Sequence, residues 1–103
     1  MKVDLHLHTY YSDGFFSPFE IVKKISKTGA KIISITDHDN IGGLKEAIRT
    51  GLKEDIEVIP GVEISGEYNG RETHILGYFI DPHSEPLKAL LKEIQKEFPE
   101  SKK

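Results

Sequence analysis

Two histidines separated by a single leucine, His6 and His8, stand near the start of the chain in the segment DLHLHTYYSDG. Residues two apart in a strand project from the same face, roughly 7 Å apart along the chain, so both imidazoles can converge on one bound ion. A lone buried histidine is more often satisfied by a backbone carbonyl, and that alternative stays open for either residue. The paired spacing favours a metal site.

Further residues that can ligate metals follow the next strand-like segments. His38 lies in TDHD, Glu63 lies in PGVEIS, His74 lies on a following hairpin and Asp13 lies in the first loop, where a turn is its alternative role. Sites in parallel α/β proteins form at the carboxyl ends of the strands. We therefore expect one cluster at that rim, made of His6, His8, Asp13, His38, Glu63 and His74.

The composition of this cluster indicates which ions it would bind. Imidazoles and carboxylates packed together without a cation would leave unpaired polar groups and repelling charges, at a cost of several kcal/mol. A mixed nitrogen and oxygen set suits zinc, manganese or iron, whereas calcium prefers oxygen alone. Six candidate ligands exceed the needs of one ion, so we expect two or three ions with Glu63 as a bridge.

Four neighbouring residues receive weaker assignments. Asp37 precedes His38 and is the candidate catalytic residue outside the ligand set, because a carboxylate there can orient a ligating imidazole. Asp39 also flanks His38, but it is equally expected to lie in a surface turn or to cap a helix. His83 is expected to be exposed and away from the rim, and Arg71 is either an exposed hairpin charge or a phosphate contact.

The strands and helices that must position these residues can be located from the pattern of apolar residues and from the residues that begin and end helices. Alternation predicts a first strand over Lys2–Leu7. Ser17 as N-cap, Pro18 at the first helical position and Glu20 completing a capping box predict a helix that ends before Gly29. A strand over 31–36 follows, and two strands joined by a helix of this length predict a parallel crossover.

The second half of the chain continues the alternation of strands and helices. Apolar residues recur with helical spacing from Ile41 to Leu52, although two glycines weaken the start of that helix. A third strand is expected over 57–64, with a hairpin after it. Asn69 and Gly70 form the hairpin turn, between arms over 64–68 and 72–80, and a last helix runs from Ser84 to Pro99. We expect an α/β fold, as an open sheet or a partial barrel.

Composition narrows the class of protein. The chain has 103 residues, 30% of them charged, with a net charge of −3, so no basic face favours general nucleic-acid binding. It contains no cysteine, which excludes thiolate sites and disulfides. No apolar run reaches membrane-spanning length, and a cytoplasmic location is the expectation. We expect one domain over residues 1–98 and a frayed tail over 99–103.

The motifs HLHTYYSDG, TDHD, PGVEIS and HILGYFID, in this order, resemble the polymerase and histidinol phosphatase (PHP) superfamily of metal-dependent phosphoesterases. The third and fourth motifs look closest to the branch of nucleoside 3′,5′-bisphosphate phosphatases and 5′-to-3′ exoribonucleases. The resemblance implies the N-terminal portion of a distorted seven-stranded β/α barrel, with parallel strands and a hairpin excursion. Its members are more than twice this length and contribute later ligands.

The resemblance also implies a three-ion centre and a role for each ligand. His6 and His8 would hold one ion, Asp13 and His38 another, His74 would serve the third, and Glu63 would bridge. The implied activity is hydrolysis of phosphate esters of nucleotides or oligonucleotide 5′ ends by metal-activated water, with manganese, zinc or iron as cofactor. The alternative is a non-catalytic metal-binding or self-assembling module, a homo-oligomer in which a second copy covers the open barrel edge.

Overall fold

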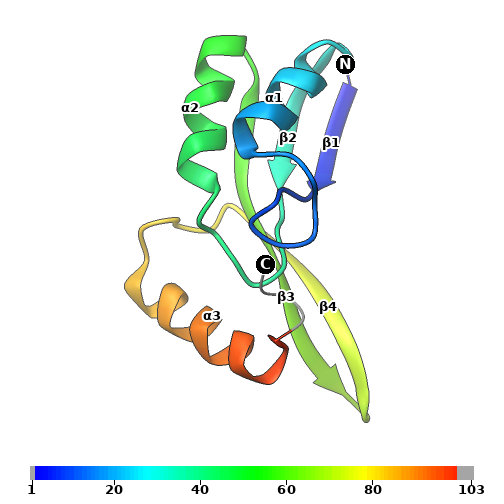
Figure 1. The fold of residues 1–103 in the computed structure, drawn as a ribbon, viewed down its shortest axis with the longest axis vertical. Helices are drawn as coiled ribbons and strands as arrows, with labels where there is room; N and C mark the ends of the chain where they lie inside the picture. The colour runs from blue at the N-terminus through cyan, green and yellow to red at the C-terminus, as the bar shows by residue number, and fades with distance from the viewer. Residues whose placement is uncertain (1, 100–103) are drawn as a thin grey trace.

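The computed structural model describes residues 2–99 and shows a twisted sheet with three helices (Figure 1). The elements in chain order are β1 (Lys2–Leu7), α1 (Pro18–Ser26), β2 (Ala30–Ile35), α2 (Leu44–Glu54), β3 (Glu57–Tyr68), β4 (Arg71–Tyr78) and α3 (Glu85–Glu97). The predicted alternation of strands and helices is therefore confirmed. Of the tail expected over 99–103, residues 100–103 lie outside the described part of the chain.

The described strands form one mixed sheet in the order β1-β2-β3-β4. β1, β2 and β3 are parallel, and β4 runs antiparallel to β3. Tyr78 of β4 donates its hydroxyl hydrogen to the carbonyl oxygen of Leu5 in β1, at 2.7 Å. Because this bond joins the two outer strands, the sheet is curled into a half-barrel rather than flat. This is the α/β fold that the sequence predicts.

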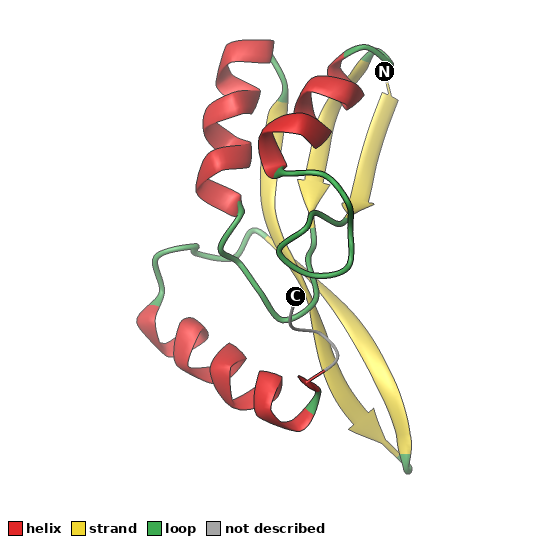
Figure 2. Ribbon diagram, in the orientation of Figure 1, coloured by secondary structure: helices red, strands yellow, loops and turns green. Residues whose placement is uncertain are grey.

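Helices α1 and α2 lie beside one another and cover one face of the parallel strands (Figure 2). The capping box predicted for α1 is present: the Ser17 hydroxyl accepts from the Glu20 amide, and the Glu20 carboxylate accepts from the Ser17 amide, each at 3.0 Å. The core between these helices and the sheet consists of Val22, Ala30, Ile33, Ile35, Leu44, Ala47 and Ile56. Its burial holds the carboxyl ends of the strands in place.

Strand β3 is longer than the sequence indicates. Its first part, 57–60, pairs with β2, and from Gly61 to Tyr68 it pairs with β4. The expected third strand and the first arm of the hairpin are thus one continuous strand. The hairpin itself is confirmed, with Asn69 and Gly70 at φ of 52° and 74° in the turn. Glu63 consequently lies in the middle of β3, where the pairing changes from parallel to antiparallel.

Helix α2 begins at Leu44 rather than at Ile41. Gly42 and Gly43 lie before the helix and pack tightly: a Cβ on Gly43 would lie 2.8 Å from Cγ of Pro18. The glycines therefore allow the loop after β2 to approach α1, at the end of the sheet that carries His38. None of the helices within residues 2–99 is both long and apolar enough to cross a membrane.

Candidate metal centre

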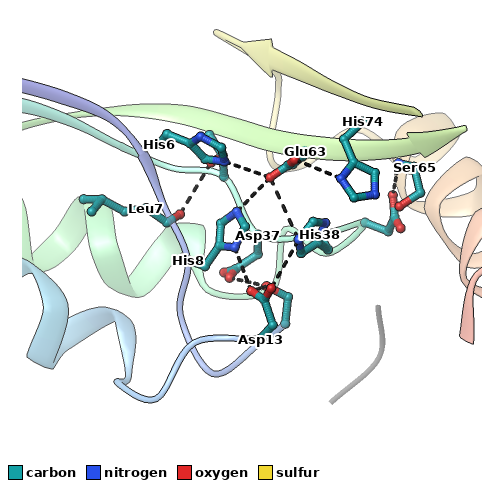
Figure 3. Close-up of polar contacts among 12 residues, drawn as sticks. His6, Leu7, His8, Asp13, Asp37, His38, Glu63, Ser65 and His74 are labelled. Atoms are coloured by element: carbon teal, nitrogen blue, oxygen red, sulfur yellow. Dashed lines mark hydrogen bonds and ion pairs between the residues drawn. The ribbon is translucent and has the colours of Figure 1, made fainter. Parts of the chain in front are cut away.

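The six predicted ligands come together at the carboxyl ends of the parallel strands (Figure 3). They reach this place from five separate segments: β1 and the residue after it, the first loop, the segment after β2, the middle of β3, and β4. The cluster that the structure brings together is His6, His8, Asp13, His38, Glu63 and His74. No predicted ligand is left outside it.

Backbone pairing past the end of β2 fixes His38 beside Glu63. The Glu63 amide donates to the Asp37 carbonyl and the Asp39 amide donates to the Glu63 carbonyl, both at 3.0 Å. These bonds form an isolated parallel bridge between His38 and Glu63. The position of the His38 imidazole is thus set by main-chain bonds to the strand that carries the central carboxylate.

The four imidazoles form a row across the sheet. Ring centroids are 5.1 Å apart between His6 and His8, 4.6 Å between His8 and His38, and 4.9 Å between His38 and His74. Four cationic rings at this spacing would repel one another. The carboxylates of Asp13 and Glu63 face these rings and offset that repulsion.

Glu63 is the hub of the cluster, with only 6% of its surface exposed. Its Oε1 lies 2.9 Å from Nε2 of His6 and 2.8 Å from Nε2 of His8. Its Oε2 lies 3.3 Å from Nδ1 of His74, and Oε1 lies 4.0 Å from Nε2 of His38. The two oxygens therefore face different imidazoles, as a bridging carboxylate requires.

Asp13 joins the cluster from the loop. One of its oxygens lies 2.7 Å from Nδ1 of His8, and the other lies 3.3 Å from Nε2 of His38. Burial raises the pKa of Asp13, but the hydrogen bond from His8 and the charges of His8 and His38 outweigh burial, so the pKa lies below its ordinary value. Asp13 therefore lies in a turn, as its alternative role predicted, and its carboxylate also contacts two imidazoles of the cluster.

The pKa of Glu63 is lowered in the same way. Burial raises the pKa, whereas hydrogen bonds from His6 and His8 and the charge of His38 lower it, and the lowering prevails. Asp13 and Glu63 are consequently both anionic at neutral pH. Carboxylates already in this form need no deprotonation before they bind a cation.

The donor atoms fall into three groups that fit a divalent ion. They are His6, His8 and Glu63; His8, Asp13 and His38; and His38, Glu63 and His74, with donor atoms within 4.8 Å of one another in each. The first and third groups share only Glu63, whose Oε1 lies near His6 and His8 and whose Oε2 lies near His74. Every group mixes imidazole nitrogen with carboxylate oxygen, as zinc, manganese and iron sites do. The residues present therefore fit such ions.

Asp37 supports the loop instead of an imidazole. It is 1% exposed and accepts from the Thr9 amide and the Thr9 hydroxyl at 2.6 Å, and from the Ser12 hydroxyl at 2.7 Å. These bonds hold the segment that ends at Asp13. Burial raises the pKa of Asp37 above its ordinary value, despite the opposing hydrogen bonds from Thr9 and Ser12.

Two residues near the cluster have surroundings that the sequence did not indicate. Asp39 is fully buried with φ of 51°, and its Oδ1 accepts from the Ser65 amide at 2.7 Å, so it is neither a surface turn nor a helix cap. Glu72 lies 2.6 Å from Nε2 of His74. Its spacing two residues before His74 in a strand is a signal that sequence reasoning missed.

His83 and Arg71 are both exposed, and neither belongs to the cluster.

The PHP domain family model matches residues 4–103, and the chain therefore belongs to the PHP domain family. It is 41% identical over 90 residues to a 5′-3′ exoribonuclease of Haemophilus influenzae, covering 87% of this chain and 33% of the relative. It is 36% identical over 94 residues to a 3′,5′-nucleoside bisphosphate phosphatase of Chromobacterium violaceum, covering 91% of this chain and 33% of the relative. The predicted family and branch are confirmed.

A solved structure has the same fold. An amidohydrolase from Chromobacterium violaceum, with bound sulfate and no metal, matches with a TM-score of 0.90 at 35% identity. The match covers 93% of this chain and 34% of that one. The chain thus spans about a third of the length of these relatives. Its half-barrel corresponds to part of a PHP domain.

Proposed function

We propose that this chain provides metal ligands for the hydrolysis of phosphate esters of nucleotides or of oligonucleotide 5′ ends. The observation that carries the proposal is the placement of Glu63, whose Oε1 faces His6 and His8 while its Oε2 faces His74. This arrangement suits a carboxylate that bridges two divalent ions. Manganese, zinc or iron would serve, and a complete centre would hold two or three ions.

The roles of the residues follow from their contacts. His6 and His8 with Oε1 of Glu63 would hold one ion, and His38 and His74 with the Glu63 carboxylate would hold a second. Divalent ions supply an acidified water and neutralise charge on the phosphoryl group. Each group provides only three protein donors, which leaves coordination positions for water and a substrate phosphate.

Asp13 contacts one histidine from each of these two groups of ligands. Its carboxylate contacts His8 and His38, so it can complete a further group or hold these two rings in place by accepting their N–H hydrogens. The loop that carries it is fixed by the buried carboxylate of Asp37. Asp37 therefore acts as a positioning residue for Asp13, and we propose no direct contact between Asp37 and substrate.

The preferred substrate class rests on the relatives, which are a 5′-3′ exoribonuclease and a 3′,5′-nucleoside bisphosphate phosphatase. Adenosine 3′,5′-bisphosphate with Mn²⁺ is accordingly the first assay substrate. We expect the unaltered chain to release phosphate. His8→Ala should release at least about tenfold less, because His8 faces both Glu63 and Asp13.

The matched control is His83→Ala, since His83 is an exposed histidine outside the cluster. It should release phosphate at the rate of the unaltered chain. Equal release from His8→Ala and the unaltered chain would reject the assignment of the site. The same assay on a 5′-phosphorylated oligoribonucleotide distinguishes the two substrate classes.

A non-catalytic metal-binding or self-assembling module is the second candidate. The observation that favours it is the open edge of the described sheet: β1 is an edge strand, and a second copy could pair with it. Bound ions without phosphate release, together with a dimer in light scattering, would favour this candidate over the enzyme.

A further inference from the structure

Glu72 and His74 form a short hydrogen bond on the hairpin, 2.6 Å between Oε2 of Glu72 and Nε2 of His74. They stand two residues apart on β4 and therefore project from the same face. The other ring nitrogen, Nδ1, lies 3.3 Å from Oε2 of Glu63. The His74 imidazole thus has one nitrogen on a carboxylate outside the cluster. The ring also faces Glu63 within the cluster (Figure 3).

We propose that Glu72 is a positioning residue that fixes the tautomer and orientation of His74 for metal binding. This inference rests on the proposed function, because it concerns the ion between His38, Glu63 and His74. No role was expected for Glu72 from the sequence. The proposal assigns it the hydrogen bond that decides which nitrogen of His74 is available to the ion.

The chemistry of the carboxylate and the imidazole determines which nitrogen of His74 carries the hydrogen. An ionised carboxylate has acceptors and no donor, so the nitrogen that contacts Glu72 must carry the hydrogen. A neutral imidazole has one N–H and one lone pair. The contact to Glu72 is 2.6 Å and the contact to Glu63 is 3.3 Å, so the shorter contact places the N–H on Nε2 and leaves the lone pair on Nδ1. Carboxylates behind ligating histidines commonly strengthen metal binding by about tenfold to hundredfold.

The alternative is that the pair is only a surface ion pair with no effect on the ion. Both side chains are partly exposed, 38% for His74 and 45% for Glu72. A matched control separates these readings, because Glu67 lies directly opposite Glu72 in the β3–β4 register. Glu67→Gln removes the same charge at nearly the same place, and the hydrogen bond that His74 donates to Glu72 is unaffected.

The first measurement uses the metal-free chain. Long-range ¹H–¹⁵N NMR identifies which nitrogen of His74 carries the hydrogen, at an alkaline pH where the ring is neutral. We expect the hydrogen on Nε2 in the unaltered chain and in Glu67→Gln. In Glu72→Gln the amide can donate as well as accept, so the tautomers should mix. An unchanged spectrum for Glu72→Gln would overturn the proposal without any reference to metal.

The second measurement is a titration of each chain with Mn²⁺ and Zn²⁺ by calorimetry. Glu72→Gln should bind about tenfold to hundredfold more weakly than the unaltered chain, and Glu67→Gln should bind within about twofold of it. Equal affinities for Glu72→Gln and Glu67→Gln would overturn the role of Glu72 in metal binding. Failure of the unaltered chain to bind either ion would overturn the proposed function, and the NMR result would still decide whether Glu72 sets the tautomer.

Discussion

Replacing Asp37 by alanine tests how the loop that carries Asp13 is held. The buried carboxylate accepts three hydrogen bonds, from the Thr9 amide, the Thr9 hydroxyl and the Ser12 hydroxyl, at 2.6, 2.6 and 2.7 Å. Thr9 and Ser12 are themselves fully buried. Alanine would leave all three donors without this acceptor.

The expected loss can be worked out from these contacts. A buried donor left without a partner costs about 1–3 kcal/mol. The two hydroxyls can rotate toward other acceptors, whereas the Thr9 amide cannot, so we count one full loss and two partial ones. Removing the charge also relieves the burial cost that raises the pKa of Asp37. The net decrease in the free energy of unfolding should be about 2–4 kcal/mol.

Urea unfolding followed by circular dichroism measures this difference. Asp4→Ala is the matched control, because Asp4 accepts one long, exposed hydrogen bond from the His6 amide at 3.3 Å. Its loss should cost less than about 1 kcal/mol. If Asp37→Ala is no more destabilising than Asp4→Ala, then the buried carboxylate does not hold the loop and the reasoning is wrong.

Three further predictions concern the frame of the site. Gly61→Ala would place a Cβ 2.5 Å from Oγ of Ser34 and should lower the free energy of urea unfolding by about 1–3 kcal/mol. Tyr78→Phe removes the hydrogen bond to β1 and should lower it by about 1 kcal/mol; an unchanged value would mean that this bond does not stabilise the curled sheet. The pKa values of Asp13 and Glu63 are depressed, so their contribution to stability is present above their ordinary values of 3.8 and 4.5 and is lost as pH falls through the folded values. Acid titration of the metal-free chain should show this loss, and Glu63→Gln should reduce it.

Local signals were sufficient for much of the fold. Ser17, Pro18 and Glu20 predict the start of α1, because capping depends on neighbouring residues alone. Asn69 and Gly70 predict the hairpin, because the turn needs positive φ at both positions. The continuity of β3 could not be predicted, since the exchange of its partner from β2 to β4 is a tertiary feature.

The site, like the fold, has features that the sequence predicts and features that depend on tertiary contacts. Spacing along strands and the common end of parallel strands predict which six side chains meet, and all of them do. The role of Asp37 depends on a loop 25 to 28 residues earlier in the chain, which no local pattern reveals. The burial of Asp39 likewise depends on its bond to the amide of Ser65 in β3.

Anomalous diffraction from crystals soaked in Mn²⁺ or Zn²⁺ tests the central claim most directly. Our account predicts density between His6, His8 and Glu63, and between His38, His74 and Glu63, about 2.0–2.3 Å from the donor atoms. Glu63→Gln crystals should lose both peaks, because this one carboxylate serves both groups. Crystals of the unaltered chain with no ion at either place would contradict the account.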